Sequence, residues 1–78
     1  MTTSAFSDPY NRLRSFLVKA RKGAGMTQAQ VADTLHKPQS YVSKYERGER
    51  RLDVIELLEV ADAMGFDPSS LLKKLKKG

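Results

Sequence analysis

Hydrogen-bonding side chains crowd one short segment of the chain, KPQSYVSKYERGER at residues 37–50. If this segment is a helix with about 100° per residue, its polar and apolar side chains separate onto two faces. An outward arc of roughly 140° then holds Gln39, Ser40, Ser43, Lys44 and Arg47. Such an arc offers amides, hydroxyls and cations to a partner outside the domain.

The opposite face of the same segment holds Tyr41, Val42 and Tyr45, which we expect to pack against a core. Taken alone, the polar face could also be an ordinary solvated surface, because a helix face that contacts only water has the same residue pattern. The rest of the chain must therefore identify the partner.

The charge of the chain is positive and unevenly distributed. The formal net charge is +5, and residues 9–51 carry most of the Lys and Arg, against only Asp33, Glu46 and Glu49. Residues 52–72 contain acids and no Lys or Arg, and lysines return in the last residues. A basic half of this kind indicates a polyanionic partner, for which nucleic acid and an anionic membrane both qualify.

Several classes of protein are excluded by composition. The 78 residues suffice for one small domain, and the longest apolar run, residues 16–18, is too short to span a membrane. The absence of cysteine removes disulfides and thiolate metal sites and fits a cytoplasmic protein. The one histidine, His36, builds neither a metal site nor a Ser–His pair, so we expect no metal, no cofactor and no enzyme.

Start and stop signals divide the chain into short helices. Asp8 before Pro9 begins the first, and Gly23 with Gly25 ends it. Its apolar residues with helical spacing are Leu13, Phe16, Leu17 and Ala20.

The second helix has the clearest start. Thr27 and Gln30 have the spacing of a capping box, and Met26 and Val31 that of a hydrophobic staple. This predicts a helix over about residues 28–35, with Val31, Ala32 and Leu35 inward.

Two further helices follow the central segment. Asp53 with Glu56 begins the fourth helix and Gly65 ends it, with apolar positions at Val54, Leu57, Leu58, Ala61 and Met64. Asp67 and Pro68 begin the fifth, with Leu71, Leu72 and Leu75 predicted inward. Since no segment alternates with period two, we predict an all-α domain at residues 9–75, a disordered extension at 1–8 and a basic tail at 76–78.

The second and third helices are joined by only three residues, 36–38, which forces the sharp corner of a helix-turn-helix. In that motif the second of the two helices, here the third helix of the chain, lies in the DNA major groove. Gln39 can pair with adenine, Lys44 can reach guanine acceptors and Ser40 can serve either base.

The segment MTQAQVADTLHKPQSYVSKYERGERRL resembles the phage-repressor and Cro-like, or XRE-type, helix-turn-helix family. The resemblance extends over about residues 10–71 and includes the pieces TQ, VS, ERG and ADAMGFDP in the family's order. It implies a compact, five-helix, lambda-repressor-like domain that binds double-stranded DNA.

The resemblance also implies a role for each matching position. Gln39, Ser40 and Lys44 match base readers, while Gln28 and Ser43 match phosphate or supporting contacts. Arg21 and Glu46 match a pair that braces the first helix against the third. The loop cations that match phosphate contacts are Arg47, Arg50 and Arg51.

The turn departs from the family pattern, which often has Gly, an apolar residue and then Ser or Thr. Here the turn is His36, Lys37 and Pro38. We therefore expect His36 at positive φ and a third helix without a hydroxyl cap, whose first residue is uncertain by one.

The sequence as a whole favours a sequence-specific regulator of transcription that binds a two-fold symmetric operator as a homodimer. Alternatives are an antitoxin or restriction–modification control protein of the same fold, or a protein-interaction module that has lost DNA binding; the basic outward face favours DNA. The end of the chain, LLKKLKKG, is expected to dock its leucines on the domain, with a dimer contact as the alternative.

Overall fold

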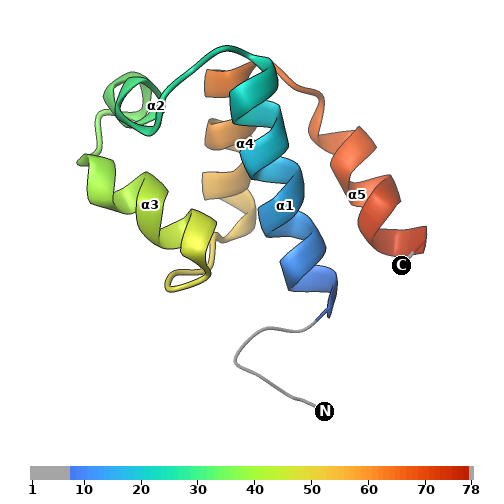
Figure 1. Ribbon diagram of the computed structural model, residues 1–78. Helices are drawn as coiled ribbons and strands as arrows, with labels where there is room; N and C mark the ends of the chain where they lie inside the picture. Colours follow the sequence, from blue (N-terminus) through green and yellow to red (C-terminus); the bar gives the residue numbers. More distant parts are fainter. Residues whose placement is uncertain (1–7, 78) are drawn as a thin grey trace.

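The computed structural model describes residues 8–77, which form five α-helices and no strand (Figure 1). The helices are α1 (Asp8–Gly23), α2 (Gln28–Leu35), α3 (Gln39–Arg47), α4 (Val54–Met64) and α5 (Pro68–Lys77). The all-α, five-helix fold is confirmed. The predicted disordered extension lies outside the described residues except for Asp8, where α1 begins, and α5 continues through two lysines assigned above to the tail.

The starts of α2 and α4 are set by two capping boxes. The Thr27 hydroxyl accepts a hydrogen bond from the backbone N–H of Gln30 at 3.1 Å, and the Gln30 side chain accepts one from the N–H of Thr27 at 2.8 Å. Asp53 and Glu56 repeat the arrangement at 2.7 and 3.0 Å. Each box satisfies two backbone donors that a helix start leaves unpaired, and a cap contributes about 1 kcal/mol.

The corner between α2 and α3 is a tight left-handed turn. His36 has φ 59°, and its backbone N–H donates to the carbonyl of Asp33 at 3.1 Å. The next N–H, from Lys37, donates to Ala32 at 2.9 Å. Pro38 then caps α3 without a side-chain hydrogen bond. The positive φ and the missing hydroxyl cap are both confirmed, and α3 starts at Gln39.

One core receives side chains from all five helices. On α3 it contains Tyr41, Val42 and Tyr45, as predicted. The full set of buried apolar residues is Tyr10, Leu13, Leu17, Val31, Ala32, Tyr41, Val42, Tyr45, Val60, Ala61, Met64 and Leu71.

Two predictions about inward-facing residues are wrong. On α4, Ala61 and Met64 are buried and Leu57 is partly buried, as predicted. Val54 and Leu58 are instead exposed and Val60 is fully buried, because the helix is apolar on most sides and its buried stripe is centred closer to Val60 than predicted. On α5, Leu71 is buried but Leu72 is exposed, since adjacent residues lie about 100° apart around a helix.

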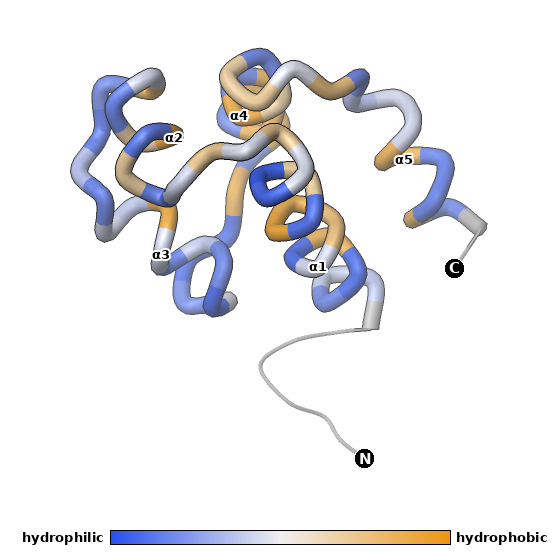
Figure 2. The backbone as a smooth tube through the Cα atoms, turned by 45° about the horizontal axis from the view of Figure 1, so that its top comes forward, coloured by the Kyte–Doolittle hydropathy of each residue, from blue (hydrophilic) through white to orange (hydrophobic). Residues whose placement is uncertain are grey.

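The arrangement leaves one side of α3 uncovered. The helix packs on α1 and α2, while α5 packs on α1 and α4 and lies on the other side of α4 from α3 (Figure 1). Most of α3 is hydrophilic and most of α4 hydrophobic (Figure 2). No helix within the described residues is both long and apolar enough to cross a membrane.

Candidate nucleic-acid interface

The outward face of α3 is the surface that the helical spacing predicts. Gln39, Ser40, Lys44 and Arg47 are exposed on it. Ser43 is half-buried, and its hydroxyl donates to the carbonyl of Ser40 at 3.4 Å. The structure therefore brings the three predicted base readers together on one accessible side of the helix.

A buried ion pair fastens α3 to α1. Arg21 donates from Nε to Oε2 of Glu46 at 2.7 Å and from Nη2 to Oε1 at 3.1 Å. A third donor, Nη1, binds the carbonyl of Met26 at 3.0 Å. The two charged side chains are only 12% and 6% exposed. The hydrogen bonds to Glu46 raise the pKa of Arg21 above its ordinary value, which outweighs the opposing effect of burial.

The same carboxylate connects the brace to the outward face. Gln28 donates from Nε2 to Oε1 of Glu46 at 2.9 Å. Gln39 in turn donates from Nε2 to Oε1 of Gln28 at 3.4 Å. The last contact is long and therefore weak. Glu46 and Gln28 therefore orient the Gln39 side chain but do not fix it in one position.

The three arginines at the end of α3 and in the loop after it differ in their surroundings. Arg47 pairs with Glu49 at 2.9 Å, and both side chains are more than half exposed, at 57% and 54%. An exposed pair of this kind is weak, so a phosphate can replace the glutamate. Arg51 stacks its guanidinium over the ring of Tyr10 at 4.5 Å and forms no ion pair among the described residues.

Arg50 is held more firmly than the sequence suggests. Its guanidinium binds both carboxylate oxygens of Glu56, at 2.7 and 3.0 Å, and lies over the ring of Tyr41 at 4.6 Å. These contacts tie the loop to the start of α4. The hydrogen bond from Arg50, with one from the backbone of Asp53, lowers the pKa of Glu56 to about 2.

Two cations near α3 were missed by the sequence analysis. Arg14 donates from Nε to the backbone carbonyl of Glu46 at 3.0 Å. Lys37 is exposed just before α3, with its ammonium 5.4 Å from the ring centre of Tyr41. The position of Lys37 beside the start of α3 was the signal that could have added it to the cations around this face. Nothing in local spacing marks Arg14, because its partner is 32 residues away.

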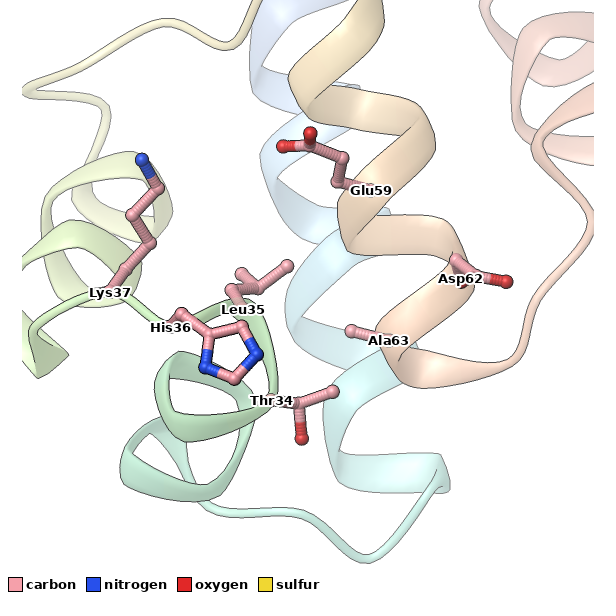
Figure 3. Close-up of a pocket in the computed structure, with 7 residues that line it drawn as sticks. All are labelled: Thr34, Leu35, His36, Lys37, Glu59, Asp62 and Ala63. Atoms are coloured by element: carbon pink, nitrogen blue, oxygen red, sulfur yellow. The ribbon is translucent and has the colours of Figure 1, made fainter.

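A shallow hollow lies between the turn and α4, with a volume of about 480 Å³ (Figure 3). His36 and Lys37 line it from the turn, and Glu59 and Asp62 from α4. Charges of both signs meet there, so it lacks the uniformly basic lining of a phosphate site. No group of three or more His, Cys, Asp or Glu within residues 8–77 is arranged to hold a metal ion.

The chain is similar to known helix-turn-helix proteins over most of its length. A family model described as "Helix-turn-helix" matches residues 17–71. The structure matches an XRE-family like protein from Pseudomonas syringae pv. tomato str. DC3000 with a TM-score of 0.84 and 48% identity, over 88% of this chain and 84% of that one.

Two more distant structures share the fold. The Restriction-Modification Controller Protein C.Esp1396I, solved as a tetramer in complex with its natural 35 base-pair operator, has a TM-score of 0.80 at 24% identity, over 92% of this chain and 95% of that one. The clp gene regulator ClgR from C. glutamicum has a TM-score of 0.79 at 22% identity, over 92% and 94%. No curated protein matches the chain. The family match and the XRE-family relative, together with the exposed third helix, establish that this chain belongs to the XRE-type helix-turn-helix family of DNA-binding regulators.

Proposed function

We propose that the chain binds double-stranded DNA in a sequence-specific manner, with α3 in the major groove, and regulates transcription. The observation that carries the proposal is the exposed group of Gln39, Ser40 and Lys44 on a helix anchored by a buried ion pair. Base reading needs side chains that reach out from a rigid support, and this helix has both. Membership of this family of regulators argues against an enzymatic role.

The side chains divide into readers and backbone contacts. Gln39 pairs with an adenine edge, Lys44 with guanine acceptors, and Ser40 with either base. Arg47, Arg51 and Lys37 approach phosphates, where they add affinity without sequence preference. Two residues support these DNA contacts from behind. Gln28 orients Gln39, and Arg50, through its ion pair with Glu56, holds the loop between α3 and α4.

We propose further that two copies bind a two-fold symmetric operator. A helix of nine residues such as α3 is about 13 Å long and spans only a few base pairs, so a single copy has little specificity. A second copy doubles the number of bases read. The C.Esp1396I controller was solved as a tetramer on its operator, so a protein with this fold can bind DNA in more than one copy.

The alternatives to a general regulator differ in what they require of this surface. An antitoxin or a restriction–modification control protein uses the same surface, and the likeness to C.Esp1396I at 24% identity shows the fold alone. A protein-interaction module without DNA binding needs no basic side chains beside the reading face. The exposed Lys37, Lys44 and Arg51 favour DNA.

The test starts from sequences selected out of a random DNA pool, with affinities measured at fixed salt. Gln39→Ala should weaken binding to the best site by about 1–3 kcal/mol and relax preference at one position. Lys44→Ala should also weaken binding to unrelated DNA, because it removes a charge. Lys19→Ala, an exposed cation on α1, serves as the control for charge alone. Equal losses on specific and unrelated DNA for Gln39→Ala would reject it as a base reader.

A further inference from the structure

Helices α1 and α5 form a groove that plays no part in the proposed DNA contacts. The two helices pack on each other and run in opposite directions, and α3 lies on the other side of α1 from α5 (Figure 1). The hollow between α1 and α5 has a volume of about 210 Å³. A partner bound in this groove therefore does not cover the reading face of α3.

The floor of the groove is apolar and well packed. It is lined by Phe16 from α1 and by Leu71 and Leu75 from α5. Leu71 is fully buried, and the other two side chains are partly buried against the core. The ring of Phe16 also contacts that of Phe66 edge to face, with the ring centres 5.2 Å apart. The floor is therefore preformed, and an apolar side chain of a partner that enters the groove is removed from water.

The rim of the groove is basic on both sides. Arg12 and Lys19 are exposed on α1, and Lys74 is exposed on α5. The Lys74 ammonium lies 5.4 Å from the ring centre of Phe16, a cation–π contact that holds the charge beside the floor. None of the three cations forms an ion pair within residues 8–77, and no Asp or Glu lines the groove. Unlike the hollow beside the turn, this groove is uniformly positive.

We propose that the groove binds an acidic amphipathic helix of a partner protein. Sites for small molecules commonly have volumes of about 300–1,000 Å³, so this groove is too small to enclose such a ligand. Large apolar side chains do fit it, which is how an amphipathic helix anchors in a groove. A nucleic-acid backbone would use the cations but not the apolar floor. The contact does not require DNA binding.

The spacing of the rim predicts the pattern of the partner helix. Arg12 and Lys19 are seven residues apart, about 10 Å along a helix, and Phe16 lies between them. A helix lying along α1 matches both cations with Asp or Glu at positions i and i+7, and the floor with Leu or Phe at i+3 and i+4. No helix within residues 8–77 carries this pattern, so the partner is a different protein rather than a second copy.

The test measures binding of a fluorescent helical peptide to the full chain in the absence of DNA. The peptide carries Glu at i and i+7 and Leu at i+3 and i+4, and its control carries Gln in place of both Glu. The acidic peptide should bind saturably, and the control should bind up to about fivefold more weakly for each charge removed, because exposed ion pairs are individually weak. Added salt should reduce the difference. Absence of saturable binding, or equal binding of the two peptides, would overturn the proposal.

Substitutions at exposed positions locate the contact. Ser15 lines the groove, so Ser15→Tyr should block it, whereas Ser15→Ala should bind the peptide like wild type. Lys19→Glu should repel the acidic peptide, and Lys22→Glu is its control, since Lys22 is exposed on α1 but does not line the groove. Full binding by Ser15→Tyr, or equal weakening by the two charge reversals, would contradict the site. Thermal melting verifies that each variant is folded.

Other occupants of the groove predict different results. Self-association that Ser15→Tyr abolishes would identify a second copy of this chain. Binding to phosphatidylglycerol vesicles that Ser15→Tyr abolishes would identify a membrane surface. A larger loss of affinity for unrelated DNA in Lys19→Glu than in Lys22→Glu would identify nucleic acid. Any of these three results would overturn the assignment of the groove to an acidic helix.

Discussion

Removing the charge of Glu46 should destabilise the domain far more than its small size suggests. In Glu46→Gln the new amide has nearly the shape of the carboxylate but only one acceptor oxygen. In the native arrangement the two carboxylate oxygens accept from two donors of Arg21, and one of them also accepts from Gln28. The amide nitrogen must therefore face another donor, and the Arg21 cation stays 12% exposed without its counter-charge.

The magnitude follows from the burial of the pair. Breaking a buried ion pair by removing one partner typically costs about 3–5 kcal/mol. A domain of this length has a total stability of about 4–12 kcal/mol. In a domain of this size each kcal/mol shifts the melting temperature by about 4–8 °C. Glu46→Gln should therefore melt at least about 12 °C below wild type, and a weakly stable domain should unfold near room temperature.

The exposed pair Arg47–Glu49 provides the matched control. Its distance of 2.9 Å is similar, but the side chains are 57% and 54% exposed, so Glu49→Gln should cost under about 1 kcal/mol. Calorimetry and urea denaturation of both variants measure the difference. If Glu46→Gln melts within a few degrees of Glu49→Gln, burial does not make the Arg21–Glu46 pair important, and the reasoning fails.

Three other substitutions test local features of the structure. The Tyr45 hydroxyl is buried and has no hydrogen-bond partner among the described residues, so Tyr45→Phe should raise the free energy of unfolding by about 1 kcal/mol in urea denaturation; a loss would indicate an unseen partner. The pKa of Glu56 is lowered to about 2, so its pair with Arg50 stabilises the fold above the ordinary pKa of 4.5 and is lost as the pH falls toward 2. Denaturation of Glu56→Gln across that window should show a smaller loss of stability than wild type, and an equal loss would contradict the assignment. For His36→Gly, relief of the positive φ opposes the greater freedom of the unfolded chain, so stability should change by under about 1 kcal/mol, and a larger change in melting would refute that balance.

The helix-turn-helix was predictable because its signals are local. The boundaries of α2 and α3 agree with the sequence analysis, since the capping box at Thr27 and the proline at position 38 each act within a few residues. The outward set on α3 follows from helical angle alone once those boundaries are known. The positive φ of His36 was also predictable, because His36 occupies the position where the family usually has glycine.

The parts that failed depend on contacts between distant segments. Helix α4 is apolar on most sides, so periodicity allows more than one buried stripe, and packing on α2 selects the one with Val60. On α5, periodicity likewise could not decide whether Leu72 is buried together with Leu71. The pair between Arg50 and Glu56 joins a loop to a helix, and residue spacing does not reveal the path of that loop. Without that path the sequence assigns Arg50 to phosphate alone.

The buried pair is better explained by what it orients than by what it stabilises. A well-packed apolar pair in place of Arg21 and Glu46 would be about as stable, because burying charges is costly. An ionised carboxylate, however, only accepts hydrogen bonds, so Gln28 must turn its amide nitrogen toward Glu46 and its oxygen toward Gln39. Gln39 then gives one of its two N–H groups to Gln28 and leaves its oxygen and the second N–H for the base contact proposed above. Those are the acceptor and donor that an adenine edge requires, so the charge buried behind α3 favours the orientation in which Gln39 can read that base.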